Sequence, residues 1–179
     1  MRKKDLVYFA FYKPINIVTH SPQKGERQIS DIFPEAKNLF PLGRLDKDSQ
    51  GLIILTNDGR ITERLLNPKY YHEKEYEVTL DRALDSKFLH DMRRGVRLDD
   101  GYVTRKCEAV KLSQNYFSII ITEGKKHQIR RMCGVLGCGV IKLERKRIMN
   151  IHLGNLRPKQ FRQIKGKELR DFLAGLGLS

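Results

Sequence analysis

Long apolar runs are missing from this sequence, and cysteine is scarce. No apolar stretch approaches the roughly 20 residues that a membrane-spanning helix needs, so a membrane protein is not expected. The three cysteines are Cys107, Cys133 and Cys138, an odd number without a second close pair or a ligand-spaced histidine. A disulfide framework and a metal site are therefore disfavoured, and we expect reduced thiols in a cytoplasmic protein.

Acidic residues are also in the minority, and positive charge dominates. The 179 residues include 35 Lys and Arg against 21 Asp and Glu, a formal net charge of +14. Such an excess predicts a polyanionic partner, with nucleic acid ahead of an acidic membrane surface. A basic surface that serves only solubility is the alternative that composition leaves open. The length suits one domain, or two small lobes that share a sheet.

The stretch from Gly43 to Gly59 places charged residues directly before an apolar run. Leu52 to Leu55 is uninterrupted and is bounded by glycine and by Asn57-Asp58-Gly59, which predicts a fully buried strand. Arg44 and Asp46 precede it in a short loop. An unpaired charge near the core is unfavourable by several kcal/mol, so these charges must either pair or serve chemistry.

Two later patterns add to this. Tyr76, Val78 and Leu80 alternate with polar residues, which predicts a half-buried strand with Tyr76 toward the core, where packing is the ordinary role of a tyrosine. Apolar residues at helical spacing from Ile129 to Leu136 predict a helix that begins near Lys125, Lys126 and His127. A helix N-terminus with added cations favours phosphate, although a solvated basic helix end is the alternative.

Four stretches, in this order, resemble the motifs of the pseudouridine synthases, and the version here is similar to the Rsu-type branch that modifies ribosomal RNA. They are Gly43–Leu52, Lys74–Tyr76, Glu123–Cys133 and Lys142–Arg145. The resemblance implies isomerisation of uridine to pseudouridine without a cofactor. It also implies an α+β fold, with a mixed, mostly antiparallel sheet in two lobes, flanking helices and a basic cleft.

The resemblance assigns three catalytic residues. Asp46 would be the essential carboxylate, acting either as a nucleophile or as a base. Arg130 would form an ion pair with it, and a cation is needed there because desolvation alone favours the neutral acid. Tyr76 would stack on the target base and assist proton removal.

Further residues are expected to bind RNA. Arg44 would fill the gap left by the flipped nucleotide, and Leu143 would lie beneath the target uracil. The remaining members of this set are cationic or polar and would line the cleft: Lys125, Lys126, His127, Gln128, Arg131, Lys142 and Arg145.

The expected partner is ribosomal RNA, with large-subunit RNA favoured and a tRNA as a possible second substrate. We expect a monomer in which residues 1–179 form one catalytic domain, without the small N-terminal RNA-binding domain of many Rsu-type enzymes. The chain could be naturally short or part of a longer protein. Two other functions stay open: a non-catalytic RNA-binding module on the same scaffold, and a metal-dependent nuclease, which would need clustered carboxylates.

Overall fold

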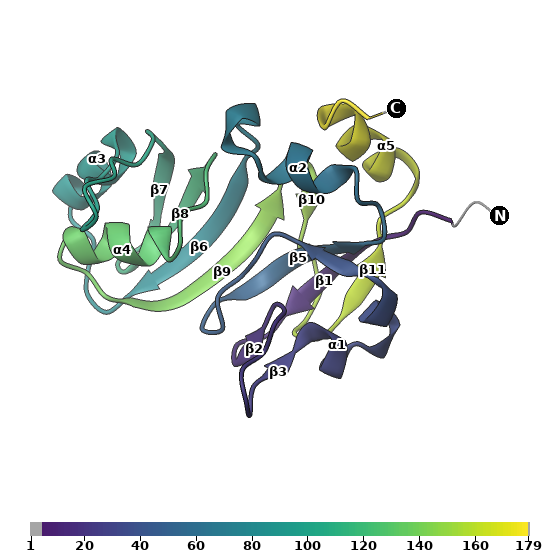
Figure 1. Cartoon of the computed structure of the whole chain (residues 1–179). Coiled ribbons are helices and arrows are strands. Elements are labelled where there is room, and N and C mark those ends of the chain that lie inside the picture. The colour runs from purple at the N-terminus through teal and green to yellow at the C-terminus, as the bar shows by residue number, and fades with distance from the viewer. Residues whose placement is uncertain (1–4, 179) are drawn as a thin grey trace.

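One long curved sheet runs through the molecule and carries helices on its faces (Figure 1). The structure is a computed structural model that describes residues 5–178. The strands are β1 (Tyr8–Lys13), β2 (Ile17–Val18), β3 (Arg27–Gln28), β4 (Phe40–Leu42), β5 (Gln50–Thr56), β6 (Lys74–Leu80), β7 (Glu108–Ser113), β8 (Tyr116–Ile121), β9 (Val140–Ile148), β10 (Ile151–His152) and β11 (Phe161–Gln163). The helices are α1 (Ile29–Ile32), α2 (Ile61–Leu66), α3 (Ser86–Arg94), α4 (Gln128–Val135) and α5 (Gly166–Gly175), with 3₁₀ turns η1 (Pro34–Asn38) and η2 (Pro68–Tyr70).

The strand order of the large sheet is β11-β1-β5-β9-β6-β8-β7, with β4 beside β5 and β10 beside β9. Every pairing in it is antiparallel except β5 with β9. The predicted α+β class with a mixed, mostly antiparallel sheet is therefore confirmed.

The first lobe, built on β1 and β5, is buried on both faces. Leu52 and Ile54 pack with α2 and α5, whereas Ile53 and Leu55 pack with α1 and η1 on the opposite face. Successive side chains of a strand point to opposite faces, so a strand between two layers must be apolar throughout. This arrangement explains the uninterrupted apolar run from Leu52 to Leu55.

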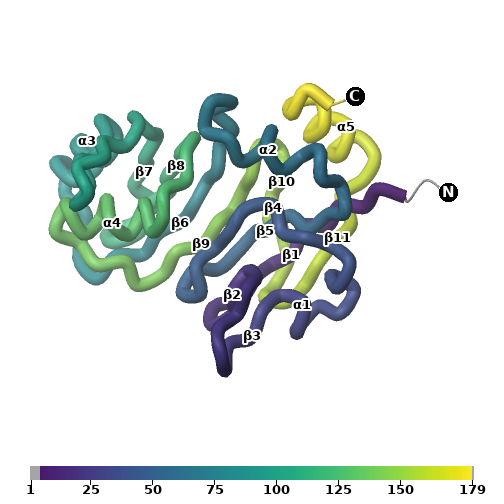
Figure 2. Tube along the Cα trace, in the orientation of Figure 1, coloured from purple at the N-terminus to yellow at the C-terminus, as the bar shows by residue number. Residues whose placement is uncertain are grey.

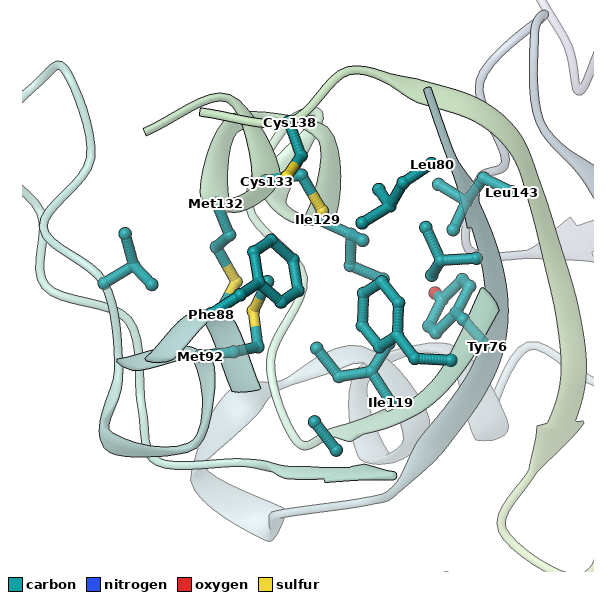
Figure 3. Close-up of a cluster of buried hydrophobic side chains, with 14 of the residues drawn as sticks. Tyr76, Leu80, Phe88, Met92, Ile119, Ile129, Met132, Cys133, Cys138 and Leu143 are labelled. Atoms are coloured by element: carbon teal, nitrogen blue, oxygen red, sulfur yellow. The ribbon is translucent and has the colours of Figure 1, made fainter. Parts of the chain in front are cut away.

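The second lobe, built on β6, β8 and β7, is covered on one face by α3 and α4. Tyr76 and Val78 belong to this core together with Ile129 and Met132 of α4. Figure 3 shows the side chain of Met132 close to those of Phe88 and Met92 of α3. The alternation predicted for β6 and the helical face predicted for α4 are both present. Within residues 5–178, no helix combines the length and apolar character needed to cross a membrane.

The two lobes meet where β5 runs parallel to β9 (Figure 2). Gly51 pairs there with Arg145, and its φ of +106° is one that side chains rarely adopt. A Cβ at Gly51 would lie 2.4 Å from the carbonyl oxygen of Arg145, so only glycine permits this close approach. The loop that carries Asp46 directly precedes β5 and is thereby held at the junction.

Candidate active site

A cavity of about 560 Å³ lies at the junction of the lobes, a size suited to a small organic group. Its walls come from the loop before β5, from β6 and β9, and from the segment that enters α4. The sequence-predicted site residues that line it are Arg44, Asp46, Tyr76, Lys125, Lys126, His127, Gln128, Leu143 and Arg145.

The Asp46 loop is fixed through its backbone. The hydroxyl of Thr19 donates to the carbonyl of Leu45 at 2.8 Å and accepts from the amide of Leu45 at 3.0 Å. The amide of Ser49 donates to the carbonyl of Asp46 at 3.0 Å, which closes the turn. The Asp46 side chain itself is 38% exposed, so it is held in place yet open to a ligand.

Two basic side chains lie near this carboxylate. His127 Nε2 lies 3.4 Å from Asp46 Oδ1. Lys13 is fully buried at the end of β1, where its ammonium donates to the carbonyls of Pro14 and Ile17. Burial lowers the pKa of Lys13 to about 8, and the nearby charge of Asp46 opposes that shift. Two basic side chains thus lie close to the Asp46 carboxylate, one in contact range and one through its charge.

Residues of β6 and β9 form another wall of the cavity. Tyr76 pairs with Arg145 across these strands, and the guanidinium carbon lies 6.0 Å from the centre of the tyrosine ring. Leu143 lies two residues before Arg145 and therefore on the same face of β9. An aromatic ring and an isobutyl group facing a cavity suit a planar base.

Lys74 shares a face of β6 with Tyr76 and also lines the cavity. Burial, with a smaller effect from the charge of Arg145, lowers the pKa of Lys74 to about 8. Cations near the cavity thus outnumber the one carboxylate. An anionic ligand would relieve their mutual repulsion.

The sequence profile described as RNA pseudouridylate synthase matches residues 7–134, most of the chain and three of the four motifs. The chain belongs to the RNA pseudouridylate synthase family. The matched residues include Asp46 and Tyr76, which line the cavity.

Relatives within this family extend the match to nearly the whole chain. The dual-specificity RNA pseudouridine synthase RluF of Escherichia coli strain K12 is 44% identical over 169 residues, which is 94% of this chain and 58% of RluF. The ribosomal large subunit pseudouridine synthase B of Bacillus subtilis is 30% identical over 97% of this chain and 74% of its own length. The chain thus spans less than two thirds of the RluF relatives that it matches.

A solved structure supports the same assignment. The crystal structure of a pseudouridylate synthase superposes with a TM-score of 0.86 at 28% identity, covering 98% of this chain and 76% of that one. The fold implied by the motifs is therefore the fold that the chain adopts.

Arg130 departs from the predicted geometry. Among residues 5–178, the ion pairs within 4.0 Å join Asp46 to His127 and not to Arg130. Arg130 instead donates to the carbonyl of Asp48 at 2.9 Å and to the carbonyl of Val140 at 3.1 Å. Its guanidinium therefore joins the backbone of the Asp46 loop to the start of β9, because those carbonyls lie nearer than the carboxylate does.

Gln128 and Arg131 were predicted to contact RNA, but both are engaged within the protein. The amide of Gln128 donates to Glu123 at 2.7 Å and accepts from the backbone of Lys125 at 2.9 Å, and the residue is 4% exposed. Arg131 pairs with Asp99 and Asp100. They order the entry to α4, and we leave them out of the proposed RNA contacts.

Lys142 does not line the cavity, contrary to the prediction. It pairs with Glu144 at 2.7 Å, and both residues lie on the opposite face of β9 from Leu143 and Arg145. The alternation of a strand puts residues 142 and 145 on different faces, so this signal was present in the sequence.

Three further residues at the site were missed from the sequence. Lys74 lies within the Lys-x-Tyr motif, so its place beside Tyr76 could have been inferred from strand alternation. Thr19 bonds to the Asp46 loop, and Lys13 lies near enough for its charge to interact with Asp46. Both residues are far from that loop along the chain, and no local pattern reveals their place.

Proposed function

We propose that this chain isomerises a uridine of ribosomal RNA to pseudouridine, with Asp46 as the catalytic carboxylate. The observation that carries the proposal is the exposed carboxylate of Asp46 in a cavity walled by Tyr76 and Leu143 and bordered by cations. Relatives named as RNA pseudouridine synthases support the same activity.

The reaction asks little of the protein besides one carboxylate and a shaped cavity. The bond between N1 of uracil and C1′ of ribose breaks, the base turns, and C5 forms a bond to C1′. The proton on C5 is lost and N1 gains one, so no group is added and no oxidant is required. Asp46 would attack as a nucleophile or remove a ribose proton, and the geometry is compatible with either route.

The target base must leave its stack to enter the cavity, at a cost of a few kcal/mol. Tyr76 would hold the flipped ring by stacking, which contributes about 1–3 kcal/mol. Arg44 lines the cavity two residues before Asp46 and would occupy the space that the base vacates. Lys125, Lys126 and His127 would contact the neighbouring phosphates.

For Arg145 and Arg130 we propose positioning roles. Arg145 is 3% exposed and donates to the carbonyl of Leu52 at 2.7 Å, which joins β9 to the start of β5. Arg130 holds the loop from the other side. The large ribosomal subunit RNA is the favoured substrate, because relatives named for it match over most of the chain. A tRNA as second substrate, a monomeric state and a cytoplasmic location stay predictions.

Pseudouridine mapping tests this function. Ribosomal RNA would be compared from cells with the gene, cells without it, and cells complemented with the Asp46→Asn variant. We expect one or a few uridines to be converted only when the wild-type gene is present. Conversion restored by Asp46→Asn, or an identical map in all three strains, would refute the proposal.

A further inference from the structure

The segment between α2 and β6, which Figure 1 shows as a connection at one edge of the second lobe, carries exposed aromatic and cationic residues. Tyr71 follows η2 and is 60% exposed, more than any other aromatic residue that the structure describes. Pro68, three residues earlier, lines the cavity. Three residues of chain span at most about 10 Å, so Tyr71 lies near the mouth.

Tyr71 packs against a guanidinium although its side chain is exposed. The guanidinium of Arg105 lies 4.2 Å from the centre of its ring. Arg105 is itself fixed, because it donates to the carbonyl of Pro68 at 2.8 Å and to that of Thr122 at 3.3 Å. The guanidinium covers one face of the ring, and the exposure of the residue leaves the other face to solvent.

The backbone of Tyr71 is unfavourable for a bulky residue. Its φ of 56° and ψ of 30° are left-handed, a conformation that costs about 1–2 kcal/mol outside glycine. Because the ring is exposed, the burial of its apolar surface contributes little free energy to offset that cost. Neither the conformation nor the exposure helps folding, which is typical of strain kept at a binding site.

We propose that Tyr71, backed by Arg105, is a stacking platform for an unpaired RNA base that neighbours the flipped nucleotide. Unpaired bases are recognised by stacking on aromatic rings and guanidinium planes. Lys69, two residues before Tyr71, lies over the ring of Tyr70, and Lys125, which lines the cavity, lies over the ring of Tyr102. Both ammonium groups would supply charge for phosphates. The proposal rests on the proposed function only for the identity of the RNA.

The test measures binding of a fluorescein-labelled single-stranded decauridylate to the full chain. Tyr71→Leu should weaken binding about 5- to 150-fold, the equivalent of one lost base stack. Tyr71→Phe keeps the ring and should bind as the wild type does. Val110→Ala removes an exposed apolar group from the sheet edge at β7 and serves as the surface control.

Salt separates stacking from charge. All affinities should fall as the salt concentration rises, because phosphate contacts carry the salt dependence. The ratio of the dissociation constants of Tyr71→Leu and the wild type should stay the same. The stacking proposal would be overturned if Tyr71→Leu bound RNA as tightly as the wild type, which would leave a protein partner as the occupant of this surface. It would also be overturned if Tyr71→Phe or Val110→Ala lost as much affinity as Tyr71→Leu. Asp46→Asn should bind normally, so failure of the proposed catalysis would leave this measurement intact.

Discussion

His127 Nε2 lies 3.4 Å from Asp46 Oδ1, and both side chains are partly exposed at the mouth of the cavity. The histidine begins α4 with a left-handed backbone, φ 52°, which aims its ring across the cavity at the loop before β5. His127 and Asp46, which are 81 residues apart in the sequence, thus lie side by side at the carboxylate that we propose to be catalytic. The basic side chain within 4.0 Å of Asp46 therefore comes from the residue that precedes α4, and not from Arg130 in the first turn of that helix.

The exposure of this pair predicts a small contribution. Partly exposed ion pairs are worth about 0–1 kcal/mol, so His127→Asn should lower the rate of pseudouridine formation by no more than about fivefold. Asparagine tolerates the left-handed backbone, so the fold should survive. The release of tritium from C5-labelled uridine in ribosomal RNA measures the rate. A loss above about a hundredfold would assign His127 a direct catalytic role.

Thr19 should matter through the position of Asp46. Its buried hydroxyl makes both hydrogen bonds to Leu45, so Thr19→Val should destabilise the protein by about 1–3 kcal/mol and slow the reaction. Thr19→Ser keeps the hydroxyl and should retain most of the rate. Urea unfolding and the tritium assay measure the two effects. Equal rates for the valine and serine variants would show that the position of the Asp46 loop does not depend on the hydrogen bonds between Thr19 and Leu45.

Gly51 tests the junction of the two lobes. Gly51→Ala adds a left-handed alanine, which costs about 1–3 kcal/mol, and a clash with the β9 backbone of similar size. Gly101→Ala is the matched control, since φ there is +83° but nothing lies within 4 Å of the added Cβ. Thermal unfolding should show a much larger loss at position 51. Similar losses at both positions would mean that the strands separate easily.

Lys74 should impose a pH dependence on stability. Its pKa is about 8 in the folded protein against an ordinary 10.5, so between these values the unfolded chain binds a proton that the folded chain does not. The free energy of unfolding should therefore rise with pH above about 8. Lys74→Met removes this contribution and should reduce the slope, as measured by urea unfolding from about pH 8 to 9, below the ordinary tyrosine pKa of about 10. An unchanged slope would contradict the buried, charged environment assigned to Lys74.

Local patterns predicted much of the fold. The apolar run of β5, the alternation of β6 around Tyr76 and the inward face of α4 each follow from the burial of neighbouring side chains. The motifs then brought Asp46, Tyr76 and Leu143 to a single site. Each of these patterns and motifs lies within a short stretch of chain, so the sequence alone suffices to find it, although Asp46, Tyr76 and Leu143 are far apart along the chain.

Long-range geometry could not be predicted in the same way. Arg130 lies 84 residues from Asp46, and its guanidinium reaches whichever acceptor the packing of α4 brings nearest, here the carbonyl of Asp48. The contact of Tyr71 with Arg105 likewise joins distant segments. The position of Lys142, in contrast, could have been predicted, because the alternation of side chains along β9 places it on the opposite face from Arg145.

The most direct test of the account compares Asp46→Asn with Asp48→Asn in the tritium-release assay on ribosomal RNA. Both variants remove one carboxylate from the same loop without changing its size, but only Asp46 lines the cavity. We predict that Asp46→Asn abolishes pseudouridine formation while RNA binding stays intact, and that Asp48→Asn stays active. Activity in Asp46→Asn close to that of the wild type would contradict the central claim.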